Sequence, residues 1–478
     1  MIKNIEKLYL FTIIFLFSGG YSTNLKLGEI MYLGRGVKSQ SILSSYIGES
    51  HLLLFNFLTN ILSILEINPK VVFNIVACIW LLLILLKAKN IFQIDQKGVL
   101  ILLLLLLNVQ SFFAAEFFFG SIEGKVFSYL SLFSSFLYAF NRKLLKSFSL
   151  YTMSIFFHAS VAIVSFPVLL IILHQNFSLH KIVKSGFPFF VICTPYLYYL
   201  LDINLNSTLT PLKKKELMEF LIAYRLPHHL FPFSEDNTNI FHINDQWVPG
   251  FIFMLVLTFS FFILFRVNNQ KTTITHQLNK IILLVLFIFW IFVLIVNFIP
   301  ISSFVLAYPF RITSSVVFLS YIFGVLKRNE LNFIYKKQLE NTFLVMLIIF
   351  SINSVLKTIE TDENLVYTNS HLEKLIIKQN PEIIFLPLYD ESSKNSYMNA
   401  IEYNTSIPTY ASYKFNVFFI KDVAEWKNRL KNLKLFYEGD CNIFYKFENY
   451  VFIDTSPKNK CGILLEKVGD YYLYRQLS

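Results

Sequence analysis

Charged residues are scarce in this chain of 478 residues. Asp, Glu, Lys and Arg make up only 15% of it, whereas soluble globular proteins carry about 25%. Hydrophobic residues instead reach 55%, with 53 Phe, and the mean hydropathy is +0.54. This balance excludes a soluble cytosolic enzyme and a disordered chain, and it predicts a protein that lies in a bilayer.

The motifs of soluble enzymes are also lacking. The sequence has no P-loop, no G-x-S-x-G, no convincing dinucleotide fingerprint and no internal repeat. Its 4 cysteines do not form a disulfide framework. The net charge of +11 is not arranged as a basic stripe interleaved with aromatic residues on a soluble face. We therefore expect no nucleic-acid partner.

Long apolar runs recur along the chain and have the length that membrane helices need. Residues 8–17 form the first run, which no convincing cleavage site follows, so we expect it to be a retained span. The further runs cover 71–86, 98–114, 124–141, 147–158, 160–174, 185–201, 249–265, 279–299, 302–326 and 341–356. The runs at 147–158 and 160–174 are expected to be short helices that break at His158-Ala-Ser160. A polar-interrupted stretch at 52–67 is expected to lie in the membrane interface without crossing.

Basic residues decide the orientation of these spans. With 52–67 left out, every basic cluster between spans falls on one side: Lys87/Lys89/Lys97, Arg142/Lys143/Lys146, Lys181/Lys184, Arg266/Lys271/Lys280 and Lys327/Arg328/Lys336/Lys337. The positive-inside rule makes that side cytoplasmic. The sequence thus predicts a polytopic α-helical membrane protein of about eleven transmembrane helices with a cytoplasmic N-terminus. Its transmembrane domain covers 1–356, with outer loops at about 22–70 and 202–248, and an extracytoplasmic C-terminal domain covers 357–478.

The C-terminal domain has the alternating patterns of a small α/β or α+β fold. Helical patterns cover His371 to Gln379 and Asp422 to Phe436, and extended patterns cover Ile383 to Leu386, Val417 to Ile420 and Tyr450 to Asp454. Gly462 to Gln476 predicts a hairpin that turns at Gly469-Asp470. Cys441 and Cys461 then lie in an oxidising compartment, either as a disulfide or as two free thiols.

Ionisable residues gather at the predicted outer ends of the spans, where such groups are candidates for function. They are Glu29 and Glu49 in the first outer loop, Glu116, Glu123 and Lys125 at a short outer turn, His158 at the helix break, Arg225, His228 and His229 in the second outer loop, and Arg311 at the start of a span. Each group also has an ordinary explanation. Arg311 can snorkel to the interface, the histidines can be surface or hydrogen-bonded residues, and the acids can be loop or ion-paired groups. Their convergence on one face favours a pocket there.

Four short segments and the overall layout resemble the GT-C glycosyltransferases, particularly bacterial members of this shape. The segments are Glu123-Gly-Lys-Val-Phe-Ser-Tyr129, Tyr224-Arg-Leu-Pro-His-His229, Tyr308-Pro-Phe-Arg311 and Glu425-Trp-Lys-Asn-Arg-Leu430. The resemblance implies an enzyme of the bacterial inner (plasma) membrane that uses polyprenyl-phosphate-linked sugars and a glycan or lipid acceptor in envelope polysaccharide or glycolipid assembly. That family places a catalytic Asp in the first outer loop, whereas this chain has no Asp before Asp95. Glu49 or Glu29 takes the place of that base.

The resemblance also implies roles for the remaining candidates. Arg225, His228, His229 and Arg311 hold the phosphate, while Glu116 and Glu123 orient sugar hydroxyls. His158 and Lys125 join them as substrate-binding candidates. A divalent metal stays open as a cofactor, but adjacent histidines rarely face one ion and no spaced third ligand is evident.

Two other functions stay open beside a glycosyltransferase or polymerase. A transporter or flippase for a lipid-linked glycan or anionic solute places its binding charges near the midplane, often in repeated halves. An accessory scaffold that presents the C-terminal domain needs no pocket. The charges here are expected at the outer face and the halves do not match, which favours the enzyme.

Overall fold

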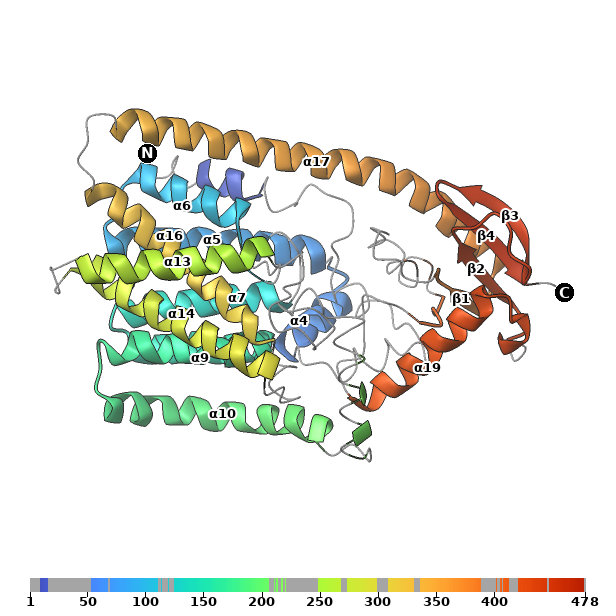
Figure 1. Ribbon diagram of the computed structural model, residues 1–478, viewed down its shortest axis with the longest axis horizontal. Coiled ribbons are helices and arrows are strands. Elements are labelled where there is room, and N and C mark those ends of the chain that lie inside the picture. The colour runs from blue at the N-terminus through green and yellow to red at the C-terminus, as the bar shows by residue number, and fades with distance from the viewer. Residues whose placement is uncertain are drawn as a thin grey trace.

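The computed structural model is a helical bundle with a small sheet domain beyond one end (Figure 1). It describes residues 9–15, 53–67, 69–110, 113, 119, 124–205, 210, 212–213, 216–217, 220, 248–267, 273–298, 308–330, 336–387, 401, 405, 407–411, 420–444 and 447–476. Residues 9–15 are helical, and Leu10 and Ile14 pack into the main core.

Each of the ten later apolar runs coincides largely with a helix. These helices are α5 (Pro69–Phe92), α6 (Gln96–Asn108), α7 (Gly124–Phe140), α8 (Leu144–Phe157), α9 (Ala159–His174), α10 (Leu179–Leu205), α13 (Val248–Val267), α14 (Ile274–Phe298), α16 (Ile312–Glu330) and α17 (Lys336–Gln379). A single 3-10 turn, η1 (Pro309–Arg311), precedes α16. The run at 302–326 therefore becomes regular helix only from about Pro309 onward among its described residues.

Four stretches of these helices are long and apolar enough to cross a bilayer among the described residues. They are Val71–Phe92, Val248–Arg266, Ile274–Phe298 and Pro309–Arg328. The apolar helices α6, α8 and α9 are shorter, at 13, 14 and 16 residues. Length and composition thus support a multi-pass membrane protein, whereas the full count of eleven spans stays a prediction.

Helix α4 (Leu53–Ile64) covers most of the stretch expected not to cross. Its 12 residues extend about 18 Å, which is shorter than the apolar layer of about 30 Å. Phe55 faces inward and its ring lies 4.9 Å from that of Phe73 and 6.0 Å from that of Phe127. On the opposite side of the helix, Leu53 is 50% exposed and Phe57 is 58% exposed. The helix therefore packs one apolar face against the bundle and leaves apolar residues exposed on the other.

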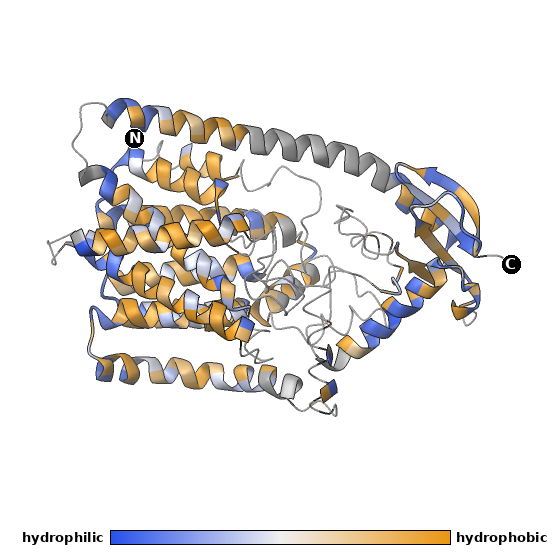
Figure 2. Cartoon of the chain, viewed as in Figure 1, coloured by the Kyte–Doolittle hydropathy of each residue, from blue (hydrophilic) through white to orange (hydrophobic). Residues whose placement is uncertain are grey.

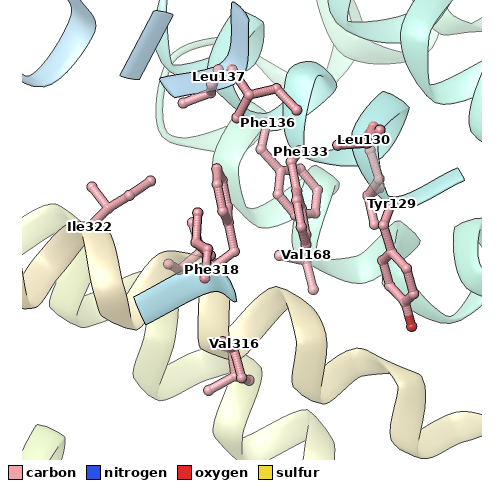
Figure 3. Packing of buried hydrophobic residues seen from close by; sticks show 14 of the residues in the cluster. Tyr129, Leu130, Phe133, Phe136, Leu137, Val168, Val316, Phe318 and Ile322 are labelled. Atoms are coloured by element: carbon pink, nitrogen blue, oxygen red, sulfur yellow. The ribbon is translucent and has the colours of Figure 1, made fainter. Parts of the chain in front are cut away.

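Aromatic and branched side chains fill the centre of the bundle. Phe133 of α7 stacks on Phe318 of α16, with ring centroids 4.2 Å apart, and both rings are buried (Figure 3). Val168 of α9 is also fully buried in this cluster. The core therefore ties α7, α9 and α16 together, and these helices also carry the polar residues considered below.

Serine pairs join α7 to α8. The hydroxyl of Ser128 lies 2.8 Å from that of Ser154, and the hydroxyl of Ser135 lies 3.1 Å from that of Ser147. All four serines are fully buried. The two pairs are seven residues apart on each helix and run in opposite directions, which is the register of an antiparallel pair. Small polar residues at such spacing let helix backbones approach closely in an apolar medium.

The chain reverses sharply between α8 and α9, as the break expected at His158-Ala-Ser160 predicts. His158 has an extended backbone, with φ −163° and ψ 97°. The hydroxyl of Ser128 lies 2.9 Å from the Ser154 carbonyl and 3.3 Å from the His158 carbonyl. The Ser154 carbonyl also accepts the backbone N–H of His158 over 2.9 Å, so Ser128 adds a contact from α7 at the point where α8 stops.

The basic clusters gather at the end of the bundle opposite this reversal. Figure 2 shows hydrophilic residues at the end where α9 turns into α10, and hydrophobic residues along the helices. There, Lys97 lies 3.0 Å from Glu340, and Arg328 contacts both Glu340 and Asp95. The predicted grouping of basic clusters at one end is thus present in the fold. Which side of a membrane it faces is a separate matter.

The C-terminal domain is a mixed sheet with helices on both faces. Its strands are β1 (Ile383–Phe385), β2 (Tyr450–Asp454), β3 (Gly462–Val468) and β4 (Tyr471–Gln476), in the order β1-β2-β4-β3. Strands β1 and β2 are parallel, and the other neighbours are antiparallel. Alternate strand residues face α19 (Ile420–Tyr437) on one side, through Phe385 and Phe452, and the end of α17 on the other, through Ile384 and Val451.

Most sequence expectations for this domain are confirmed. The hairpin turns at Gly469-Asp470, where Gly469 has a positive φ of 61°. The extended pattern at Val417 to Ile420 is wrong at Ile420, because α19 begins there, and the rest of it lies outside the described residues. Helix α17 continues through the expected boundary between 356 and 357. It therefore connects the bundle to the sheet without a linker.

A disulfide joins Cys441 in the turn η3 (Cys441–Phe444) to Cys461 before β3, whereas Cys78 and Cys193 are free and buried. Of the two alternatives for the C-terminal cysteines, the disulfide is the one present. It closes a loop over a separation of 20 residues beside the core that α19 covers.

Because the paired serines are buried, a larger side chain at one of them is expected to destabilise the protein. Ser147→Leu is expected to lower the free energy of unfolding by about 1–3 kcal/mol, because the larger side chain overfills the α7–α8 contact. Ser149→Leu is the matched control, since Ser149 lies on the same helix but is exposed. Thermal unfolding in detergent measures both variants. Equal melting temperatures would contradict the packing role of Ser147.

The disulfide predicts a thiol count. Denatured protein is expected to react at two thiols per chain without reductant and at all 4 after reduction. The double variant Cys441→Ser/Cys461→Ser is expected to destabilise the C-terminal domain by about 3 kcal/mol, because its unfolded chain gains loop freedom. Mass spectrometry after alkylation reports the count, and four reactive thiols without reductant would exclude the bridge.

Candidate functional site

A buried polar cluster lies where α9 and α16 begin. His158 and Ser160 come from the reversal between α8 and α9, and Arg311 closes η1 ahead of α16. One turn further along, Ser165 of α9 lies 3.3 Å from Ser315 of α16. The Ser160–Arg311 and Ser165–Ser315 contacts advance in the same direction along both helices, so the two N-terminal ends lie side by side.

The three side chains contact one another directly. Arg311 Nη1 lies 3.4 Å from His158 Nε2 and donates to the hydroxyl of Ser160. The Ser160 hydroxyl in turn lies 3.1 Å from His158 Nδ1. The exposed fractions are 7% for Arg311, 4% for His158 and 8% for Ser160. Arg311 is therefore held inside the protein at this point, and snorkelling to the surface does not describe it.

This geometry selects one form of the imidazole. A guanidinium only donates hydrogen bonds, so His158 Nε2 must present its lone pair to Arg311. The proton of a neutral His158 then lies on Nδ1, where it can be donated to Ser160. The hydroxyl oxygen of Ser160 can then accept from both side chains. The cluster as a whole thus offers positive charge and donors.

The ring of Tyr308 packs against the guanidinium of Arg311. The guanidinium carbon of Arg311 is 4.3 Å from the centroid of the Tyr308 ring, a distance at which cation and ring attract each other. The backbone N–H of Arg311 also donates to the Tyr308 carbonyl over 3.0 Å. The same tyrosine therefore supports Arg311 through its ring and through its main chain.

Helix lengths set the depth of this cluster in an apolar layer. The 14 residues of α8 and 16 of α9 extend about 21 and 24 Å, short of the roughly 30 Å that a hydrocarbon core requires. If the basic ends of these helices lay at one face of such a layer, the turn at His158 would lie inside it. A charged side chain at such depth is costly and is by default a candidate for function.

The arrangement can bind an anion. Two helix N-termini side by side add positive potential from their aligned peptide dipoles. Arginine adds a fixed charge and a planar fork of donors that matches phosphate or carboxylate oxygens. His158 and Ser160 supply further polar atoms beside Arg311. A phosphate or carboxylate group is the ligand chemistry that these features recognise together.

Most other predicted site residues cannot be compared with this cluster. Glu29, Glu49, Glu116, Glu123, Arg225, His228 and His229 lie outside the described residues. Lys125 is half-buried in the first turn of α7. Of the predicted residues, the structure thus brings together Arg311 and His158. For a metal, no group of three His, Cys, Asp or Glu side chains occurs within the part of the chain that the structure describes.

Ser160 and Tyr308 belong to the cluster but were not among the predicted site residues. Ser160 stood in the sequence as part of the helix break, and its distance of two residues from His158 was the available signal. Tyr308 stood in the segment Tyr308-Pro-Phe-Arg311. Neither pattern alone predicts a contact with Arg311, because that contact depends on how α9 packs against α16.

The comparisons with known proteins add no assignment. No family model matches the chain, and no curated protein is similar to it in sequence.

Because Arg311 and His158 both contact the hydroxyl of Ser160, loss of this hydroxyl is expected to lower stability more than loss of the Ser165 hydroxyl. Ser160→Ala is expected to destabilise the protein by about 1–3 kcal/mol, because buried donors of Arg311 and His158 lose their shared acceptor. Ser165→Ala is the matched control, since it removes only the longer contact with Ser315 and is expected to cost about 0.6 kcal/mol. Thermal unfolding in detergent compares them. A larger effect at Ser165 would contradict the proposed hydrogen bonding.

Proposed function

We propose that this protein is an integral membrane glycosyltransferase or polymerase that acts on polyprenyl-phosphate-linked sugars. The observation that carries the proposal is the buried Arg311–His158–Ser160 cluster at two adjacent helix N-termini. A lipid-linked phosphate is an anion that reaches this depth with its hydrocarbon chain in the bilayer. Few soluble anions reach such a position, so the depth of the site favours a lipid-borne group.

The reaction would use the cluster to stabilise the leaving group. As the sugar is transferred, the bond between its anomeric carbon and the phosphate oxygen breaks, and negative charge develops on the phosphate. Arg311 is placed to stabilise that charge with fixed donors. Removal of a single preorganised donor of this type slows enzymes about 10²–10³-fold. His158 and Ser160 would orient Arg311 and contact the same oxygens.

The other predicted residues complete the proposed site. Glu49 or Glu29 would accept the proton of the attacking acceptor hydroxyl as general base. Arg225, His228 and His229 would contribute to binding the phosphate, and Glu116, Glu123 and Lys125 would contact sugar hydroxyls. These roles follow from the resemblance to the GT-C glycosyltransferases.

We further propose a bacterial inner-membrane location with about eleven spans. The basic clusters at one end of the bundle would be cytoplasmic. The Cys441–Cys461 disulfide belongs to the domain beyond the other end, and disulfides are typical of oxidising compartments outside the cytoplasm. Charge and redox chemistry thus support the same orientation, with the Arg311 cluster toward the outer face.

A transporter or flippase for a lipid-linked glycan or anion is the second candidate. The break between the short helices α8 and α9 favours it, because transporters bind anions at the N-termini of broken helices. The same cluster would then hold the phosphate during transfer across the membrane, without cleaving it.

Turnover of a lipid-linked sugar tests the proposal. Purified protein in liposomes is expected to release polyprenyl phosphate from a polyprenyl-phosphate-linked sugar, and Arg311→Ala is expected to lower the rate about 100-fold or more. Arg266→Ala is the matched control, because Arg266 is an exposed arginine at the opposite end of the bundle and should leave the rate unchanged.

The same assay separates the alternatives. Glu49→Gln or Glu29→Gln is expected to abolish turnover, and full activity in both would exclude them as the base. Movement of the lipid-linked sugar between leaflets without release of polyprenyl phosphate would favour the transporter. Full turnover in Arg311→Ala would contradict the role of the buried cluster.

A further inference from the structure

Tyr308 has a backbone conformation that is unfavourable for its position. Its φ of 54° and ψ of 65° lie in the left-handed region, which non-glycine residues seldom adopt. The following Pro309 also restricts the residue before it, and normally favours an extended backbone there. Such a conformation persists only where surrounding contacts hold it, and it often occurs where a site is held in a defined geometry.

The backbone of Tyr308 determines where Arg311 lies. Its carbonyl accepts the N–H of Arg311 over 3.0 Å and so closes the first turn of η1. A change to the extended conformation would turn this carbonyl away and open that turn. The ring, 4.3 Å from the guanidinium carbon, would leave Arg311 at the same time.

The side chain of Tyr308 is buried in the apolar cluster that continues into the C-terminal domain. Tyr308 is 8% exposed and belongs to the apolar cluster that includes Leu217 and Trp426. Trp426 of α19 is 2% exposed and packs in that cluster with Phe385 of β1. One aromatic residue therefore joins the sheet domain to the polar cluster of the bundle.

Helix α19 makes a second contact beside this one. Lys427 lies 2.6 Å from Glu216 and 5.1 Å from the centroid of the Phe220 ring, and the Phe220 ring lies 5.5 Å from that of Trp426. The hydrogen bond from Lys427 lowers the pKa of the Glu216 carboxyl. The C-terminal domain is thus seated on the chain segment that follows α10 as well as on Tyr308.

We propose that Tyr308 is a positioning residue through which the C-terminal domain holds Arg311 in its anion-binding geometry. Packing of the domain stabilises the left-handed conformation of Tyr308, and that conformation closes η1 and places the ring against the guanidinium. Release of the domain lets the backbone relax and separates Arg311 from Ser160 and His158. The role for a lipid phosphate rests on the proposed function, whereas the coupling itself does not.

Hydrogen exchange on the full-length protein tests the coupling without any ligand. Tyr308→Ala is expected to raise exchange about tenfold in peptides that cover residues 309–312, because it removes the ring and disfavours the positive φ. Tyr308→Phe keeps the ring and should match the wild type. Peptides from α5, which packs against α6 and α7, serve as an internal control for global unfolding.

A charge exchange between Lys427 and Glu216 tests the docking of the domain while the Tyr308 ring stays in place. Lys427→Glu and Glu216→Lys alone are expected to raise exchange at 309–312 about two- to fivefold, the range for an exposed ion pair. The double variant restores the pair with reversed charges and should return exchange toward the wild-type rate. Unchanged exchange at 309–312 in Tyr308→Ala and in both single charge variants would overturn the proposal.

Binding of a polyprenyl monophosphate in nanodiscs supplies the second readout. Tyr308→Ala is expected to weaken it about tenfold and Tyr308→Phe less than twofold, with binding measured well below the melting temperature of each variant. No binding by the wild type, with the exchange changes present, would refute the proposed function and leave the coupling intact. Wild-type affinity in Tyr308→Ala would overturn the positioning role.

Discussion

The close packing of α7 against α8 through buried serine pairs is the contact beside which the chain reverses from α8 into α9. A helix that stops within an apolar layer leaves carbonyls without donors, and no water is there to satisfy them. Ser128 of α7 lies within hydrogen-bond distance of the Ser154 and His158 carbonyls, and it does so because the serine pairs hold α7 close to α8. The Ser154 carbonyl also accepts the N–H of His158 over 2.9 Å, so the end of α8 is closed by its own backbone and by a contact from α7. The break places His158 and Ser160 at the start of a new helix.

The break also brings the N-termini of α9 and α16 side by side. Because α9 begins at the reversal, it runs in the same direction as α16, and the aligned dipoles of the two helices both oppose a cation at their N-termini. Arg311 nevertheless lies there, 7% exposed, and is held by contacts that include His158, Ser160 and the Tyr308 ring. A site that accumulates positive potential in a medium of low dielectric gains most from an anion. The apolar core around Phe133 and Phe318 is what keeps this arrangement from relaxing.

Much of this fold could be predicted because it follows from local patterns. Apolar runs locate the helices, His158-Ala-Ser160 locates the break, and Gly469-Asp470 locates the hairpin turn. The site was only partly predictable, because its contacts join residues about 150 positions apart, such as Ser160 and Arg311. The left-handed backbone of Tyr308 had no local signal, since tyrosine before proline ordinarily favours an extended chain. Likewise, the parallel pairing of β1 with β2 joins strands separated by α19, and only tertiary packing determines it.

Helix α17 constrains how the C-terminal domain can move. Its 44 residues extend about 66 Å, roughly twice the apolar layer. Lys97 and Asn108 of α6 contact Glu340 and Ser351 near its start, and Leu372 and Ile376 near its end are buried under the sheet. The domain is therefore joined to the bundle through α17 on one side and through the contacts of Tyr308 and α19 on the other. Under the proposed coupling, separation of the second set of contacts would reach Arg311 through Tyr308, because the Tyr308 ring and carbonyl both contact Arg311.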